Sequence, residues 1–239
     1  MDSFLVALQF LTRIPINYRF VASEALWGRS VLYYPAVGLL LGSLFCAMAL
    51  LLSGAPPLLQ AALLLTAWVL LTGGLHLDGL ADCADAWVGG YGDKERSLRI
   101  MKDPASGPIA VSLLVLVLLL KFAALAALLE AADFAALLLA PVLGRVAILV
   151  LMLTTQYVRP QGLAEQLLQQ LPVAAAGWLV AVCVLLALVL LGLPTLLAGG
   201  LLLLWLRHAA VSRLGGVTGD VYGAAVELTE TAVLIAAAL

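Results

Sequence analysis

The chain has 239 residues, of which 64% are hydrophobic and 11% charged, and its mean hydropathy is +1.14. A single soluble core cannot hide this much apolar surface, so the composition excludes an ordinary soluble globular protein and predicts one that folds in a lipid bilayer. The formal net charge of −2 is uninformative, because the position of charges relative to the membrane matters more than their total, and nothing in the composition supports a nucleic-acid partner.

The predicted elements are helices, because long apolar runs alternate with short polar breaks and lack the residue-by-residue alternation of barrel strands. Residues 1–10 hold only a brief apolar run before Arg13, so they are predicted to form an interfacial helix rather than a signal peptide. About seven transmembrane helices follow, at residues 31–52, 57–72, 108–129, 134–154, 173–191, 194–206 and 221–239. The predicted fold is an all-α, polytopic membrane helical bundle that forms a single catalytic domain over residues 1–239.

The basic residues predict how these helices are oriented. Ten of the twelve Lys and Arg residues fall in alternate connections on one face, namely Arg13, Arg19, Arg29, Lys94, Arg96, Arg99, Lys102, Arg159, Arg207 and Arg213. The connections between them, at residues 53–56, 130–133 and 192–193, hold none. The positive-inside rule makes the basic face cytoplasmic. Every connection long enough to build a site lies on that face, so an active site is expected to face the cytoplasm.

Acidic residues gather directly after the second predicted span. In a helix, Asp78, Asp82 and Asp85 recur at i, i+4 and i+7 and therefore share one face over two turns. Like charges this close need a cation. Hard oxygen ligands suit Mg²⁺, which also binds substrate phosphate oxygens, so the pattern predicts a Mg²⁺ site for phosphoryl chemistry.

The alternative is that these aspartates form a solvated helix face at the membrane surface. That interpretation leaves the neighbouring Gly73, Gly74 and Gly79 unexplained, as well as His76 at the end of an apolar span. A metal site is therefore favoured.

Residues 101–108 are typical of a loop that enters a helix at Pro108, where backbone N–H groups are available to an anion. Within this loop, Asp103 is a candidate metal ligand or base, and Lys102 is a candidate for neutralising phosphate charge. A capped helix start beside a snorkelling Lys102 is the alternative.

Charges also occur inside the predicted spans. Arg145 lies about 13 Å from the basic end of its helix at ~1.5 Å per residue, so it is expected to face the bundle interior and pair with a carboxylate or an anionic ligand. Lys121 is expected to reach the outer interface. Burying Glu227 and Glu230 in lipid is energetically costly, so their presence in an apolar span favours a functional site there.

The segment before the last span is rich in glycine and holds Gly216, Thr218 and Asp220. Such a loop can wrap a polar ligand closely. A simple turn is the alternative.

These stretches, taken in order, resemble the cobalamin synthase family over nearly the whole chain. The matching motifs are GGLHLDGLAD at residues 73–82, MKD at 101–103, GR at 144–145 and GGVTGD at 215–220, with FLTRIP at 10–15 and YPAVG at 34–38. The order and spacing of these motifs make the match more specific than any one of them.

The resemblance implies a cytoplasm-facing enzyme of a bacterial or archaeal cytoplasmic (inner) membrane, adenosylcobinamide-GDP ribazoletransferase, acting in the last steps of cobalamin biosynthesis. A ribose hydroxyl of α-ribazole, or of its 5′-phosphate, attacks the phosphorus bonded to cobinamide in adenosylcobinamide-GDP. Adenosylcobalamin, or its 5′-phosphate, forms and GMP departs. Mg²⁺ is the implied cofactor.

The resemblance also implies the roles of the site residues. The implied metal ligands are Asp78, Asp82, Asp85 and Asp103. The implied catalytic residues are Asp78, Asp82, Asp103 and His76. The implied substrate-binding residues are Lys102, Arg145, Gly79, Gly107, Gly216, Thr218 and Asp220.

The chain departs from the family pattern at Ala110, where many relatives have glycine. It also has Ala81 before Asp82, where the CDP-alcohol phosphotransferases place arginine, which argues against phospholipid synthesis. Two alternatives remain: another CDP-alcohol-type phosphotransferase, and an ion-coupled transporter that uses the charges inside the spans. The expected partners are the two substrates and the lipid bilayer, and a homo-oligomer is left open.

Overall fold

The computed structural model describes residues 2–16, 24–159 and 162–239, and in this part of the chain every regular element is a helix. The helices are α1 (Asp2–Leu11), α2 (Glu24–Ser30), the 3₁₀ helix η1 (Val31–Tyr33), α3 (Tyr34–Leu51), α4 (Pro57–Thr72), α5 (Leu75–Gly89), α6 (Lys94–Ile100), α7 (Pro108–Glu130), α8 (Ala135–Thr154), α9 (Leu163–Gln169), α10 (Val173–Leu214) and α11 (Gly219–Ala238). The predicted all-α fold is confirmed.

Five helical segments of the described chain are long and apolar enough to cross a bilayer: Ala25–Leu51, α7, α8, α10 and α11. The pair α4 and α5 passes the same criterion only together, with an 87° bend between its two helices, and would make a sixth. The predicted number of about seven spans is one higher than six, because two of the predicted spans belong to the single element α10.

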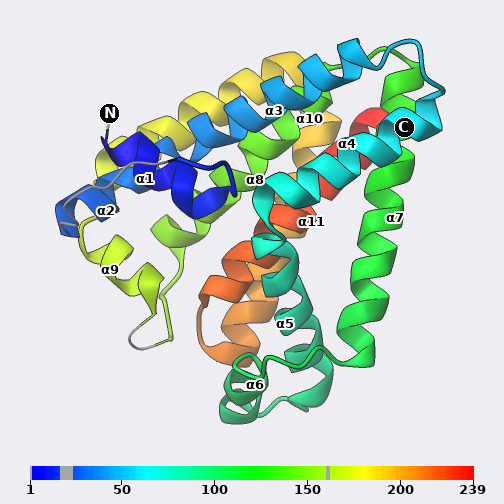
Figure 1. The fold of residues 1–239 in the computed structure, drawn as a ribbon. Coiled ribbons are helices and arrows are strands. Elements are labelled where there is room, and N and C mark those ends of the chain that lie inside the picture. Colours follow the sequence, from blue (N-terminus) through cyan, green and yellow to red (C-terminus); the bar gives the residue numbers. More distant parts are fainter. Residues whose placement is uncertain (1, 17–23, 160–161) are drawn as a thin grey trace.

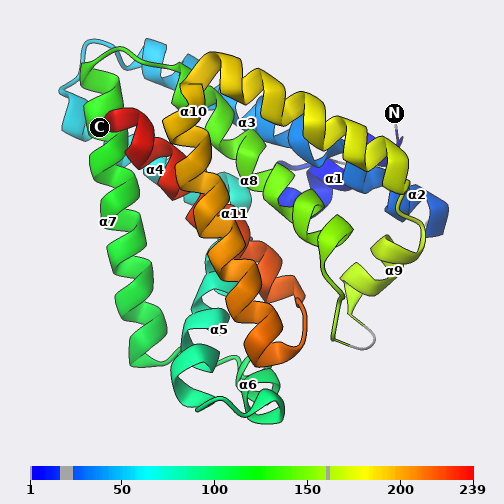
Figure 2. The same ribbon diagram turned by 180° about the vertical axis from the view of Figure 1, so that it is seen from behind.

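Helix α10 is one element of 42 residues, broken at Gly192, where φ is 78° and ψ is 169°. At ~1.5 Å per residue it would measure about 63 Å, twice the thickness of a hydrocarbon core. Pro194 follows the break and cannot supply the backbone N–H that a continuous helix needs. Figures 1 and 2 show two arms meeting at a sharp bend, and the predicted spans at 173–191 and 194–206 lie in these two arms, the second of which continues to Leu214.

Two successive glycines turn the chain from α4 into the acid-bearing helix α5. Gly73 has φ 65° and Gly74 has φ 71°, a left-handed conformation that glycine adopts without a Cβ clash. The backbone N–H of Arg13 donates to the carbonyl of Leu71 at 2.7 Å, which joins the segment after α1 to this corner. The glycine pair therefore directs α5 away from the axis of α4.

Helix α11 runs through the middle of the molecule and packs against α5, α7, α8 and α10 (Figure 1). Most of its residues from Val221 to Leu234 are buried, including Glu227 and Glu230. Because α11 contacts four neighbours, its N-terminal end is held firmly beside α5.

The tight connections lie at the opposite end of the molecule from the connection that contains α6. In both views, residues 52–56, residues 131–134 and the bend at Gly192 lie at the top, whereas α6 lies at the bottom and α2 and α9 lie along one side. The position of α6 agrees with the predicted division between the two faces. Which face is cytoplasmic stays a prediction, and Arg19, one of the basic residues used for it, lies outside the described residues.

Candidate active site

The candidate site forms where α5 meets the start of α11. Glycines allow this close approach, since a Cβ on Gly79 would lie 2.7 Å from the carbonyl oxygen of Asp220. A Cβ on Gly223 would likewise lie 3.1 Å from the carbonyl oxygen of His76. Gly79, predicted to bind substrate, therefore serves first to bring Asp220 next to the helix that carries the other aspartates.

Three carboxylates share this region. Asp78 is exposed and Asp82 is half-buried one turn further along α5. Asp82 interacts electrostatically with Asp220 and Asp78, and Asp78 and Asp220 line the same cavity. The structure thus brings together three of the predicted site residues from two distant parts of the sequence.

Two cations lie beside these carboxylates. Nη1 of Arg159 donates to Oδ2 of Asp220 at 3.0 Å, and Oγ1 of the buried Thr218 donates to the same oxygen at 3.2 Å. Lys102 lines a small pocket together with Arg159, Thr218 and Asp220. The predicted residues Lys102 and Thr218 therefore lie with Asp220.

Arg159 was not among the predicted site residues. It follows Tyr157 and Val158, which lie against the loop before α11. Tyr157 forms a parallel β-bridge with Val217, and the N–H of Val158 donates to the Val217 carbonyl at 2.9 Å. Burial raises the pKa of the Tyr157 phenol. In the sequence, the only signal for Arg159 was its place as a lone basic residue directly after a span.

Gly216, predicted to bind substrate, has a structural role in the same loop pairing. A Cβ there would clash with the carbonyl oxygen of Gln156 and lie 2.6 Å from a methyl group of Val158. Glycine is thus required for the 215–218 loop to lie against the segment that carries Arg159.

The structure places Asp85, a predicted metal ligand, at the start of α7. Its Oδ2 accepts a hydrogen bond from Gly107 N–H at 2.5 Å, and its Oδ1 accepts one from Ala110 N–H at 3.0 Å. Both oxygens therefore satisfy backbone donors that the first turn of a helix leaves unpaired. Gly107 is needed because a Cβ there would lie 2.7 Å from Oδ1 of Asp85.

Asp103 also lies away from the other predicted ligands. It is exposed, its Oδ1 accepts a hydrogen bond from Ala105 N–H at 3.0 Å, and it lines a surface hollow with Asp85 and Gly107. That hollow does not include Asp78, Asp82 or Asp220. The four predicted metal ligands are thus not gathered into one cluster.

The remaining donor set fits a magnesium ion that is completed by substrate. Within residues 2–16, 24–159 and 162–239, no group of three or more His, Cys, Asp or Glu side chains is arranged to hold a metal ion. Mg²⁺, however, commonly takes only one or two carboxylates and fills its other positions with water and phosphate oxygens. Asp78 and Asp82, one helical turn apart, meet that requirement without Asp85 or Asp103.

His76 lies deeper, in a cavity of about 120 Å³ that Asp78 and Asp220 also line. It is 3% exposed, and neither of its ring nitrogens has a hydrogen-bond partner in the described structure. The Tyr222 hydroxyl, in the same cavity, also has none. The predicted catalytic residue His76 thus lies below the carboxylates rather than among them.

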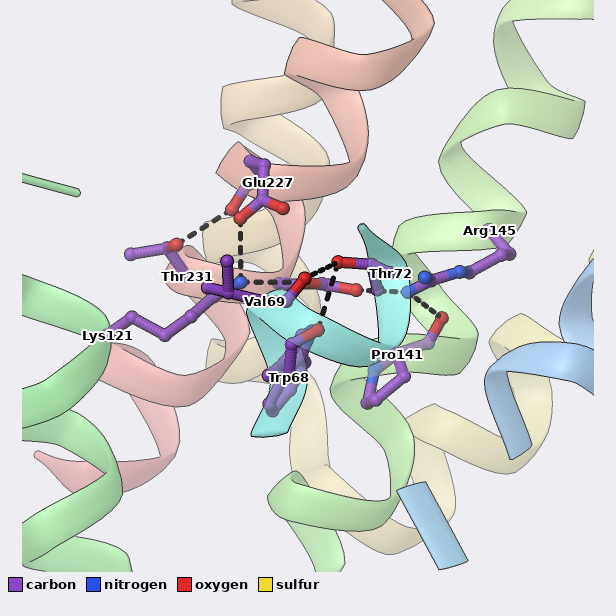
Figure 3. A network of polar contacts seen from close by, with 9 residues as sticks. Trp68, Val69, Thr72, Lys121, Pro141, Arg145, Glu227 and Thr231 are labelled. Carbon is purple, nitrogen blue, oxygen red and sulfur yellow. Dashed lines mark hydrogen bonds and ion pairs between the residues drawn. The ribbon is translucent and has the colours of Figure 1, made fainter. Parts of the chain in front are cut away.

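The charges inside the spans form a separate buried network (Figure 3). Nζ of Lys121 lies 2.8 Å from Glu227 and 2.7 Å from Glu230, and 4.6 Å from the ring centroid of Trp68. The prediction that Lys121 reaches the outer interface is wrong, because α7 turns this side chain toward α11.

Arg145 belongs to the same network. Its Nη1 donates to Glu230 and to the Pro141 carbonyl, and the residue is fully buried. The expectation that Arg145 pairs with a carboxylate is confirmed. Its predicted role in binding substrate is not supported by this position, because Glu230 of α11 supplies the anion.

Comparison with known proteins gives a consistent result over the whole chain. The family model described as cobalamin-5-phosphate synthase matches residues 3–238. The chain is 57% identical, over 239 residues, to the adenosylcobinamide-GDP ribazoletransferase of Pseudomonas putida strain GB-1, covering 100% of this chain and 99% of the relative. It is 56% identical to the protein of the same name from Stutzerimonas stutzeri strain A1501, covering 98% and 97%. No solved structure matches the chain.

Proposed function

The chain belongs to the cobalamin-5-phosphate synthase family, and from this premise we propose that it catalyses the reaction for which its relatives are named, adenosylcobinamide-GDP ribazole transfer. A ribose hydroxyl of α-ribazole, or of its 5′-phosphate, forms a new bond to the phosphorus attached to cobinamide. The pyrophosphate bond to GMP breaks, GMP takes the electron pair, and the hydroxyl proton leaves to a base or to solvent. The observation that carries the proposal is the meeting of Asp78, Asp82 and Asp220 with Arg159 and Lys102.

Cleaving a pyrophosphate requires neutralisation of the charge on both phosphates and alignment of the attacking hydroxyl with the leaving oxygen. We assign Asp78 and Asp82 to holding Mg²⁺, which when bound neutralises phosphate charge. Arg159 and Lys102 border the pocket next to Asp220, so they are assigned to the phosphate of the leaving GMP. Asp103 and Asp85 have no part in this assignment.

The site is further proposed to face the cytoplasm of a bacterial or archaeal cell from its inner membrane. Most of the basic residues lie in the long connections, and two of these, which carry Lys102 and Arg159, meet at the site, where both side chains line one pocket. Both substrates reach the enzyme from the cytoplasm under this orientation.

The transporter alternative finds no support in the buried charges. Lys121, Arg145, Glu227 and Glu230 pair with one another, two cations against two anions. A set of charges that neutralise one another inside the bundle is explained by helix packing and does not require a transported ion.

The proposal is tested by incubating the purified protein with adenosylcobinamide-GDP, α-ribazole and Mg²⁺ and measuring GMP release. Asp82→Asn is expected to lower turnover by on the order of 100-fold or more, because the metal loses a charged ligand. Asp133→Asn is the matched control, since Asp133 is exposed at the opposite end of the molecule. Absence of GMP release from the wild-type protein, or full turnover in correctly inserted Asp82→Asn, would refute the proposal.

A further inference from the structure

The cavity below the carboxylates has a chemistry that the transfer reaction does not by itself explain. Its walls are apolar and aromatic, with Phe10, Tyr34, Ile148 and Met152 among them. The rings of Phe10 and Tyr34 stack with centroids 6.2 Å apart and planes inclined by 21°. Asp78, which also lines the cavity, is exposed, so the cavity reaches the surface beside the carboxylates.

Two polar side chains in this apolar surrounding have unused hydrogen-bonding capacity. The Tyr222 side chain is 5% exposed and its hydroxyl has no partner, and both nitrogens of His76 are likewise unpaired among the described residues. Leaving buried donors unpaired is costly, because each group loses its hydrogen bonds to water on burial and gains none in return. Groups of this kind that line one cavity indicate a ligand that supplies their partners.

From this cavity we infer that the enzyme binds the aromatic base of the acceptor nucleoside there, with Tyr222 and His76 as its polar contacts. This inference rests on the proposed function. Ribazole is a nucleoside whose base is a dimethylated benzimidazole, a flat and largely apolar bicycle with one free acceptor nitrogen. The methylated ring enters between Ile148, Met152 and the aromatic walls, and the acceptor nitrogen takes a hydrogen bond from Tyr222 or His76.

The size of the cavity limits how much of this occupant it encloses. An enclosed apolar cavity of about 150 Å³ holds one benzene-sized ring. The cavity observed here is smaller, at 120 Å³, but it opens to the surface beside Asp78, so the methylated six-membered ring enters it while the five-membered ring extends toward the carboxylates. The attached ribose then lies next to Asp78 and Asp220, where its hydroxyl reaches the phosphorus. Base and reacting hydroxyl are thereby placed by a single cavity.

The other aromatic group of the substrates, guanine, fits less well. Its edges carry several donors and acceptors, and burial without partners for each of them is unfavourable. Besides His76 and Tyr222, the polar lining consists of Asp78, which is assigned to the metal, and Asp220, which is paired with Arg159, and the remaining contacts are mainly apolar. The corrin ring of the donor is far too large. The cavity therefore discriminates between the two nucleosides by polarity.

Steady-state kinetics of Tyr222→Phe test the assignment. Loss of one buried hydrogen bond is expected to raise the KM for α-ribazole about fivefold, with the KM for adenosylcobinamide-GDP unchanged. Tyr33→Phe is the matched control, because Tyr33 is adjacent to the cavity residue Tyr34 but does not line the cavity. Ile148→Trp, which fills the cavity, is expected to weaken α-ribazole binding at least about tenfold.

Equilibrium binding of α-ribazole and of GMP, measured separately by calorimetry on the detergent-solubilised protein, keeps this test independent of turnover. If the wild-type protein binds α-ribazole in a Tyr222-dependent manner but releases no GMP, the transfer reaction is wrong and the base site stands. A Tyr222→Phe effect confined to the donor KM or to GMP binding would assign the cavity to guanine and overturn the inference. Equal α-ribazole binding by Tyr222→Phe, Ile148→Trp and wild-type protein, or no binding by any, would also overturn it.

Discussion

At the scale of single residues, the roles of the aspartates depend on what each carboxylate touches. Asp78, Asp82 and Asp85 belong to one helix face, yet Asp85 uses both oxygens to cap α7 while Asp82 interacts with Asp220. One helical turn therefore separates a proposed metal ligand from a residue that stabilises a helix terminus.

Asp85→Asn distinguishes these two roles. The amide keeps one oxygen acceptor, so the variant is expected to lower the free energy of unfolding by about 1 kcal/mol, measured by thermal denaturation in detergent. The Mg²⁺ concentration for half-maximal activity is expected to stay at the wild-type value, whereas Asp78→Asn raises it. An equal rise for Asp85→Asn would show that Asp85 binds the metal.

At the scale of elements, one ion network ties α7 and α8 to α11. Lys121 of α7 and Arg145 of α8 both contact Glu230, and Lys121 also contacts Glu227 (Figure 3). Because the N-terminal end of α11 carries Asp220, this network also holds the helix on which one of the site carboxylates depends.

Lys121→Met is expected to destabilise the protein by about 3–5 kcal/mol, since it leaves buried carboxylates without one of their two cations. Adding Glu227→Gln restores the charge balance and is expected to recover much of this loss. The measurement is thermal denaturation in detergent, and the control is Lys94→Met, at an exposed lysine of α6. If the double variant were no more stable than Lys121→Met, charge balance would not be the reason for the network.

At the scale of the whole molecule, tight turns lie at one end and the long polar connection that contains α6 lies at the other (Figures 1 and 2). Ser53 and Ser106 are exposed residues in one connection of each kind. In a variant lacking Cys46, Cys83 and Cys183, a membrane-impermeant maleimide applied to intact cells is expected to label Ser53→Cys and to label Ser106→Cys only after permeabilisation. Labelling of Ser106→Cys in intact cells would reverse the proposed orientation.

The sequence by itself determined that this protein is helical and folds in a bilayer, where most of its spans lie, and which helix face carries the aspartates. Hydropathy and helical periodicity are properties of neighbouring residues, so they can be read along the chain. The connection predicted at residues 192–193 coincides with the break at Gly192, where a glycine and the following Pro194 interrupt the helix locally.

Only the tertiary structure decided which charges meet. Arg159 and Asp220 are 61 positions apart, and Lys121 and Glu230 are 109 apart, so their pairing depends on which helices pack together. The same packing turned Lys121 inward and placed Asp85 against the start of α7. It also formed the cavity that His76 and Tyr222 line. Side-chain partners depend on how distant helices pack together. Hydrophobic periodicity shows only that one face of a helix is buried and does not show which helix packs against that face.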